Sequence, residues 1–115
     1  MEKDYKIHGI RGATSIEEDN AAHISERVLE LWKEIILNND ILRVISVIFS
    51  VTSDIKSLNP ATVLRKKLNL NTIPFMCLTE PEFENSFSKI IRVLIICESS
   101  TQNFVYLHKA SQLRQ

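Results

Sequence analysis

The chain is poor in the residues that mark common phosphate-binding and nucleophilic motifs. Glycine occurs only twice in its 115 residues, as Gly9 and Gly12, and proline only three times. A Gly-x-x-Gly pair has the spacing of neither the Walker nor the Rossmann loop, which excludes those nucleotide sites. The sequence has no Gly-x-Ser-x-Gly elbow, so hydrolase chemistry of that type is excluded as well.

Cysteine and histidine are also scarce. Cys77 and Cys97 lie in apolar runs, and His8, His23 and His108 show no ligand spacing with the cysteines or with each other. We therefore expect no structural or catalytic metal. A Cys–His catalytic pair stays open, although a cysteine in an apolar strand is more often a small core residue. The start of the chain has no signal-peptide pattern, so we expect free thiols in a reduced, cytoplasmic protein.

The formal net charge is zero, because 14 basic residues balance 14 acidic ones. No overall field attracts nucleic acid or an anionic membrane, and any anion site must be local. The longest apolar runs fall far short of the roughly 20 residues that cross a bilayer. We therefore expect residues 1–115 to form a single domain, with 44% hydrophobic residues to build its core.

Hydrophobic periodicity predicts an α+β fold, in which a mixed sheet of about five strands packs with a long amphipathic helix and a short one. Asp19 or Asn20 is expected to cap the long helix, and Asn59 before Pro60 to cap the short one. The expected strands cover 5–14, 41–51, 73–78, 89–97 and 103–107, and the expected helices 19–38 and 60–68.

The run from Lys89 to Cys97 is the strongest strand signal. It is rich in β-branched residues and apolar on both alternating faces, which predicts a strand covered on both sides. Arg92 lies in its middle and keeps its charge, so it needs anions or acceptors if it is buried. Two interpretations stay open: Arg92 reaches water at a strand end, or it points into a pocket for an anionic small molecule.

Other polar residues favour the pocket. Arg11 lies between the two glycines, Arg65 on the short helix, Glu80 just after a strand and Tyr106 in the last strand. Together with Arg92 they would form a pocket for a small polyanion that carries a hydroxyl. Such a site positions and polarises its ligand, and it contains no obvious base or nucleophile.

Five separated motifs agree with one family. They are Gly9-Ile-Arg-Gly-Ala-Thr14, Pro60-Ala61 with Arg65, Pro74-x-x-Cys77-x-x-Glu80, Ile91-Arg92-Val93, and Val105-Tyr106-Leu107 with Leu113-Arg114. In this order and spacing the chain resembles the monofunctional, trimeric class of chorismate mutase over nearly its whole length. The resemblance implies an α/β-barrel-like homotrimer with active sites between subunits. It also implies cofactor-free rearrangement of chorismate to prephenate, on the route to phenylalanine and tyrosine.

The resemblance also assigns roles. Arg92 would donate to the ether oxygen of the substrate and to an adjacent carboxylate, Arg11 and Tyr106 would bind the enolpyruvyl carboxylate, and Glu80 with Cys77 would bind the ring hydroxyl. Arg65 and Arg114 would attract the dianion at the mouth of the site. The full set of expected substrate contacts adds Asn59, Thr62, Phe75, Met76 and Leu113.

Two positions depart from the family pattern. Asn59 replaces an aromatic residue and Thr62 replaces a lysine, which predicts weaker substrate capture with an intact chemical step. Two alternatives stay in view, a non-catalytic trimeric metabolite-binding module and a small trimeric imine-hydrolysing deaminase. A sensor has no need for Arg92 opposite an ether oxygen. The deaminase ranks lower because its substrates are monoanionic, whereas this chain offers several cations and Glu80; a purely structural trimer ranks last.

Overall fold

The computed structural model describes residues 3–114, and side chains as far as residue 113. Strand, helix, strand and helix are followed by three further strands, in the order expected from the sequence. The elements are β1 (Lys6–Ser15), α1 (Ala21–Leu37), β2 (Ile41–Val51), α2 (Pro60–Lys67), β3 (Phe75–Thr79), β4 (Ile90–Ser99), β5 (Val105–Tyr106) and the 3₁₀ helix η1 (His108–Arg114).

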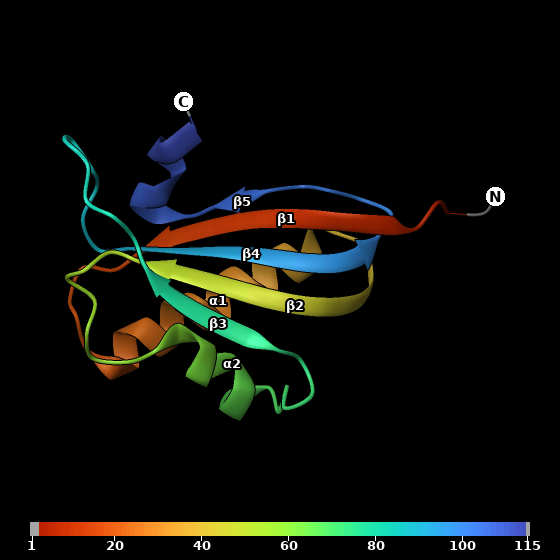
Figure 1. Cartoon of the computed structure of the whole chain (residues 1–115), viewed down its shortest axis with the longest axis horizontal. Coiled ribbons are helices and arrows are strands. Elements are labelled where there is room, and N and C mark those ends of the chain that lie inside the picture. The colour runs from red at the N-terminus through yellow and green to blue at the C-terminus, as the bar shows by residue number, and fades with distance from the viewer. Residues whose placement is uncertain (1–2, 115) are drawn as a thin grey trace.

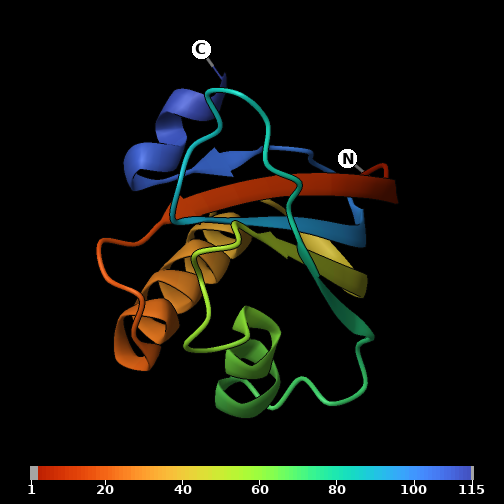
Figure 2. The same ribbon diagram turned by 60° about the vertical axis from the view of Figure 1, so that its left-hand side comes forward.

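The strands form one mixed sheet in the order β3-β2-β4-β1-β5 (Figure 1). The central β4 runs antiparallel to β1 and β2, whereas the edge strands β3 and β5 pair parallel with their inner neighbours. Both α-helices lie on the same side of this sheet (Figure 2). The prediction of a mixed sheet of about five strands with helices is thus confirmed. No helix within residues 3–114 has the length and hydrophobicity that a bilayer crossing requires.

The main core lies between the sheet and the helices. On α1, the buried apolar residues are spaced by three or four positions, so they form one stripe facing the strands. The stripe is Ile24, Val28, Leu31 and Ile35, and it belongs to the same buried cluster as Phe49, Ile91 and Ile95 of the sheet. The helix-covered face of the sheet is therefore closed within the single chain.

The helix ends follow the capping signals in the sequence. The Asn20 side chain accepts a hydrogen bond from the backbone N–H of His23, and Asn59 accepts one from Ala61. Pro60 occupies the first position of α2, where the missing N–H costs nothing. Both predicted N-caps are confirmed, with Asn20 rather than Asp19 in that role.

Gly12 permits close approach of a helix to the sheet. A Cβ atom at this position would lie 2.6 Å from Ile35 Cδ1 and 3.3 Å from Leu31 Cδ1, both on α1. The contact with Ile35 is too short for carbon atoms, so a side chain here would force the Ile35 side chain or α1 to shift. The pairing of β1 with β4 runs without interruption through Gly12, which therefore marks an approach rather than a bulge.

The expectation that β4 is covered on both sides holds only at Ile90 in the single chain, because the rest of the strand is covered on one face only. Ile91, Val93, Ile95 and Cys97 are buried on the helix side, whereas Arg92 and the alternate residues after it stay partly exposed. Leu94 and Ile96 on this second face are apolar as well, so the pattern resembled a strand buried on both sides. We call the uncovered side the open face.

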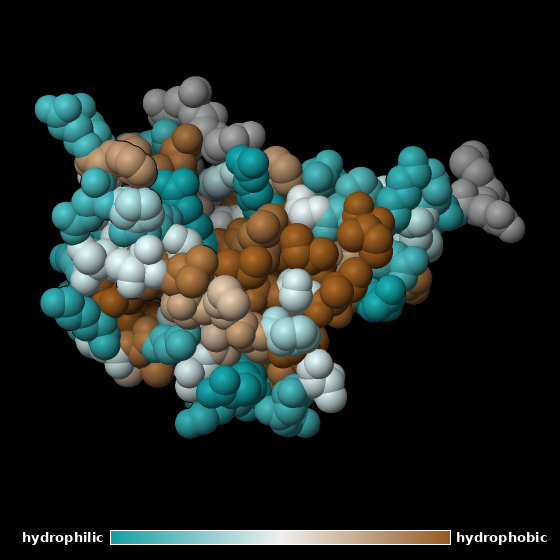
Figure 3. Space-filling model, in the orientation of Figure 1, coloured by the Kyte–Doolittle hydropathy of each residue, from teal (hydrophilic) through white to brown (hydrophobic). Residues whose placement is uncertain are grey.

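The open face carries a hydrophobic patch over the middle of the sheet (Figure 3). Strand register places its members on one side, since directly paired residues point the same way. They are Ile7, Ile48, Met76, Leu78, Leu94 and Ile96, with Ile7, Met76 and Leu78 at least half exposed. A contiguous patch of this kind on a small protein marks an interaction surface.

The end of the chain differs from the expected strand at 103–107. Only Val105 and Tyr106 pair with β1, because His108 adopts a positive φ of 53° and turns the chain into η1. The 3₁₀ helix then packs on the open face, where Ala110 and Leu113 join Ala13 and Tyr106 in a small second cluster. A chain segment far from β1 in sequence is thereby fixed beside it.

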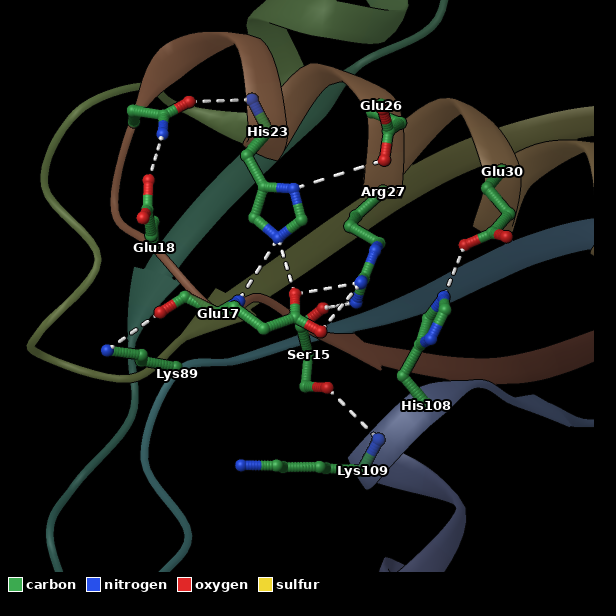
Figure 4. Close-up of polar contacts among 11 residues, drawn as sticks. Ser15, Glu17, Glu18, His23, Glu26, Arg27, Glu30, Lys89, His108 and Lys109 are labelled. Carbon is green, nitrogen blue, oxygen red and sulfur yellow. Dashed lines mark hydrogen bonds and ion pairs between the residues drawn. The ribbon is translucent and has the colours of Figure 1, made fainter.

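A polar cluster fixes the junction between β1 and α1 (Figure 4). The buried Arg27 guanidinium donates to the Ser15 carbonyl at 2.6 Å and to both carboxylate oxygens of Glu17 at 2.9 and 2.8 Å. His23 Nε2 lies 2.7 Å from the same carboxylate. Hydrogen bonds from Arg27 and then from His23 lower the pKa of Glu17 to about 2.

The depressed pKa of Glu17 predicts acid sensitivity. Its ordinary value is 4.5, so the unfolded chain binds this proton at a higher pH than the folded one. The contribution of Glu17 to stability is full above that ordinary value and is lost as the pH falls toward 2. Glu17→Gln should unfold more easily in urea at pH 7 and lose less stability than wild type between pH 5 and pH 3.

The matched control is Glu84→Gln, an exposed position in the loop between β3 and β4. Its urea denaturation curves should follow those of wild type at each pH. Parallel pH profiles for Glu17→Gln and wild type would show that the Arg27 contact does not couple folding to protonation.

Candidate active site

A cavity of about 350 Å³ lies on the open face where β1, β2, β4, β5 and η1 meet. Its lining includes Arg11, Ala13, Ile48, Ser50, Arg92, Leu94, Tyr106 and Leu113. A second cavity, of about 510 Å³, shares Ser50, Arg92 and Leu113 with the first and extends beneath the loop after β3 to Glu80. Four predicted site residues thus line the first cavity, and Glu80 joins them through the second.

Strand register explains why residues so far apart in sequence converge. Ala13 of β1 pairs with Arg92 on one side and with Tyr106 on the other, so both side chains flank a small methyl group. Arg11 lies two residues before Ala13 and therefore points to the same face. The small side chain of Ala13 leaves the space that larger residues would fill.

Arg92 is held by a carboxylate from within the chain. Its Nε lies 2.7 Å from Glu80 Oε1, with 48% of the Arg92 side chain and 17% of the Glu80 side chain exposed. Glu80 is itself fixed at the end of β3, where its backbone N–H donates to the Val51 carbonyl at 2.8 Å. Arg92 thus lines both cavities beside a carboxylate that the fold itself supplies, and about half of its side chain is exposed.

Arg11 has a different kind of partner. Its guanidinium carbon lies 5.8 Å from the centroid of the Phe104 ring, and no ion pair to a carboxylate is formed by Arg11 within residues 3–113. The two cavities are therefore lined by two guanidinium groups and one carboxylate. The excess positive charge suits an anionic ligand.

The other predicted site residues form a separate group on α2 and β3. This group contains Asn59, Thr62, Arg65, Phe75, Met76 and Cys77, none of which lines either cavity. The Asn59 side chain is engaged in capping α2. The Arg114 side chain lies outside the described residues. A single chain therefore brings together Arg11, Glu80, Arg92, Tyr106 and Leu113, and leaves the second group apart.

Cys77 belongs to that second group. It pairs in register with buried Phe49 and packs against the main core, and burial raises the pKa of its thiol. The thiol therefore stays protonated at neutral pH, which suits a hydrogen-bond donor better than a nucleophile. The expected pairing of Cys77 with Glu80 on one hydroxyl is not formed within one chain.

Two aromatic residues that line the site, and a third that contacts Arg11, were missed in the sequence. Phe83 and Phe87 in the loop after β3 line the second cavity, with 73% and 43% of their surfaces exposed. The presence of two large aromatic residues in an otherwise polar loop could have indicated that this loop contacts a ligand. Phe104 precedes Tyr106 by two positions, so strand alternation could have indicated that it lies near the same face.

The fold and the cavity together define a class of protein. It is a two-layer α/β protein with one open sheet face, and its cavity is cationic and contains no metal-ligand cluster among residues 3–114. The sequence profile of the chorismate mutase type I family matches residues 7–115, and the chain belongs to this family.

Individual relatives agree with this assignment. The chain is 30% identical over 114 residues to chorismate mutase AroH of Bacillus subtilis, covering 94% of this chain and 90% of that protein. It is 32% identical over 115 residues to chorismate mutase AroH of Thermus thermophilus, covering 94% and 93%. A solved chorismate mutase of Clostridium thermocellum superposes with a TM-score of 0.84 at 30% identity, covering 91% of this chain and 98% of that one.

Proposed function

We propose that the chain, acting as a single domain over residues 1–115, rearranges chorismate to prephenate in cytoplasmic phenylalanine and tyrosine biosynthesis. The observation that carries this is the convergence of Arg92, Glu80, Arg11 and Tyr106 on one pair of cavities. They come from four separate segments of a chain that belongs to the chorismate mutase type I family. The reaction is an intramolecular Claisen rearrangement, which needs positioning and electrostatic stabilisation only.

Arg92 is the residue that acts on the reacting atoms. As the carbon–oxygen bond of the ether breaks and the new carbon–carbon bond forms, negative charge accumulates on the ether oxygen. The guanidinium donates to that oxygen and to a neighbouring carboxylate. Glu80, 2.7 Å away, holds the guanidinium in place before substrate binds, so little reorganisation is needed in the transition state.

Arg11 and Tyr106 select the reactive conformation. They reach the cavity from β1 and β5, where they bind the enolpyruvyl carboxylate. Glu80 accepts a hydrogen bond from the ring hydroxyl, and Leu113 of η1 closes one side of the cavity. Fixing both ends of the substrate places the two reacting carbons near each other.

The second group of residues completes the site from a neighbouring copy. Asn59, Thr62, Arg65, Phe75, Met76 and Cys77 lie around the edge strand β3, whose outer backbone groups have no strand partner within residues 3–114. The adjoining open face is hydrophobic, so three copies bury it in a barrel-like homotrimer. In this arrangement Arg65 lies at the mouth of each cleft, and Cys77 meets the ring hydroxyl opposite Glu80.

The direct test is the loss of chorismate absorbance with purified protein and no added cofactor. Consumption well above the spontaneous rate, with prephenate identified by chromatography and proton NMR, is the expected result. Calorimetric binding of chorismate without faster consumption would instead indicate a metabolite-binding module. If the protein neither bound nor consumed chorismate, the assignment to this substrate would be overturned.

Thr62→Lys is expected to improve substrate capture. Thr62 is a half-buried, uncharged residue on α2, in the group that we place at the neighbouring cleft. Adding a cation there should lower KM up to about fivefold and leave kcat unchanged, since one partly exposed charge pair contributes up to about 1 kcal/mol. Thr62→Gln, with a long but neutral side chain, should keep the wild-type KM. An unchanged KM in Thr62→Lys would place α2 away from the substrate.

A further inference from the structure

Arg11 and Arg92 line the same cavity, but different partners orient them. Arg92 forms an ion pair with Glu80, whereas the Arg11 guanidinium lies over the ring of Phe104, 5.8 Å from its centroid. A cation over an aromatic face is attracted by the negative potential of the ring. The two cations of the site are thus held by different physical interactions.

We propose that Phe104 is a positioning residue that holds the Arg11 guanidinium toward the cavity while leaving its N–H donors free for the substrate carboxylate. The proposal rests on the function given above. A carboxylate beside Arg11 would accept those donors and cancel the charge that the substrate must find. An aromatic ring contacts the face of the guanidinium plane and leaves its edges free to donate.

The Phe104 backbone is fixed on both sides, as positioning requires. The preceding residue, Asn103, receives a hydrogen bond on its carbonyl from Asn39 Nδ2 at 2.9 Å and donates its own N–H to Asn39 Oδ1 at 2.8 Å. Its side-chain amide also donates to the Asn38 carbonyl at 2.8 Å. The following residue, Val105, pairs with Gly12 of β1. The backbone that carries the ring is therefore anchored to the end of α1 and to the strand that carries Arg11.

The Phe104 ring also has a purely structural role in packing, and the test must distinguish this role from the orientation of Arg11. Phe104 is partly buried and contacts the main core. Phe104→Leu keeps most of this apolar contact and removes the aromatic face, and Phe104→Tyr keeps both. Phe104→Met is a second non-aromatic variant with a flexible side chain, in case leucine packs poorly. Thermal unfolding of each variant sets an assay temperature at which all are folded.

The experiment is a double-mutant cycle with Arg11→Ala, read as kcat/KM for chorismate. With Arg11 unchanged, Phe104→Leu and Phe104→Met should lower kcat/KM about three- to tenfold, as expected for loss of a cation–aromatic contact. Phe104→Tyr should stay within twofold of wild type. In the Arg11→Ala background, Phe104→Leu should have no further effect. Equal losses in both backgrounds, or no loss in the first, would overturn the proposal.

Failure of the underlying function has a separate signature. The wild-type assay is run in the same series, so a wild type that binds chorismate without converting it identifies a failed enzyme assignment. The cycle is then read on the calorimetric Kd for chorismate, with the same expected pattern. The Arg11 side-chain Nε–H resonance, displaced by the ring current of Phe104, should move toward its random-coil position in Phe104→Leu. An unmoved resonance would show that the ring does not face the guanidinium, whatever the turnover.

Discussion

Arg92→Ala is expected to reduce kcat for chorismate by about 10²- to 10³-fold, the usual effect of removing one preorganised donor to a developing oxyanion. The loss should appear in kcat because the ether oxygen becomes strongly charged only in the transition state. The fold should persist, since 48% of the side chain is exposed and its backbone stays paired in the centre of the sheet. Stopped-flow or steady-state absorbance measurements give both constants.

The chain offers a matched control for this variant. Arg43 Nε lies 2.9 Å from Glu98 Oε1, an arginine–glutamate pair between neighbouring strands, and neither residue lines the two cavities. Arg43→Ala should keep the wild-type kcat. Arg92→Lys, which retains the charge but not the planar fork, should remain well below wild type. A change confined to KM in Arg92→Ala would mean that Arg92 attracts the substrate without acting on the ether oxygen.

The elements were predictable because their signals are local. Asn20 and Asn59 are strong caps, and the runs of β4 and β2 are rich in β-branched residues. The coverage of β4 was not predictable, because Leu94 and Ile96 are apolar without being covered by the two helices. A sheet face covered by another copy and a sheet face covered by a helix both favour apolar residues. The sequence alone therefore cannot tell which of the two covers a strand.

The site residues were identified by type, but their arrangement depended on strand register. Nothing local to Arg92 or Tyr106 indicates that both pair with Ala13, since that pairing joins segments about 80 or more residues apart. The division of the site into two groups has the same origin, because Cys77 and Glu80 are only three positions apart and yet face different surroundings. Phe104 acts through Arg11, so no family motif pointed to it.

Leu78→Asp is expected to dissociate the protein and abolish most of its activity. Leu78 is 50% exposed on the open face, beside Met76, which is 56% exposed. An aspartate at position 78 is therefore hydrated in the single chain but buried where two copies meet. A charge buried without a partner opposes association. Light scattering should give about three times the 13.2 kDa chain mass for wild type and the mass of one chain for the variant.

Concentration dependence separates dissociation from a direct effect on the cavity, because Leu78 pairs in register with Ser50, a lining residue. If each site needs two copies, the specific activity of Leu78→Asp should rise with protein concentration as copies reassociate. A local effect on the cavity would leave it constant. Leu37→Asp, at an exposed apolar residue on α1, should remain trimeric and active. A wild type that is fully active as a single 13.2 kDa chain would contradict the shared site, because Asn59, Thr62 and Cys77 could then reach no substrate.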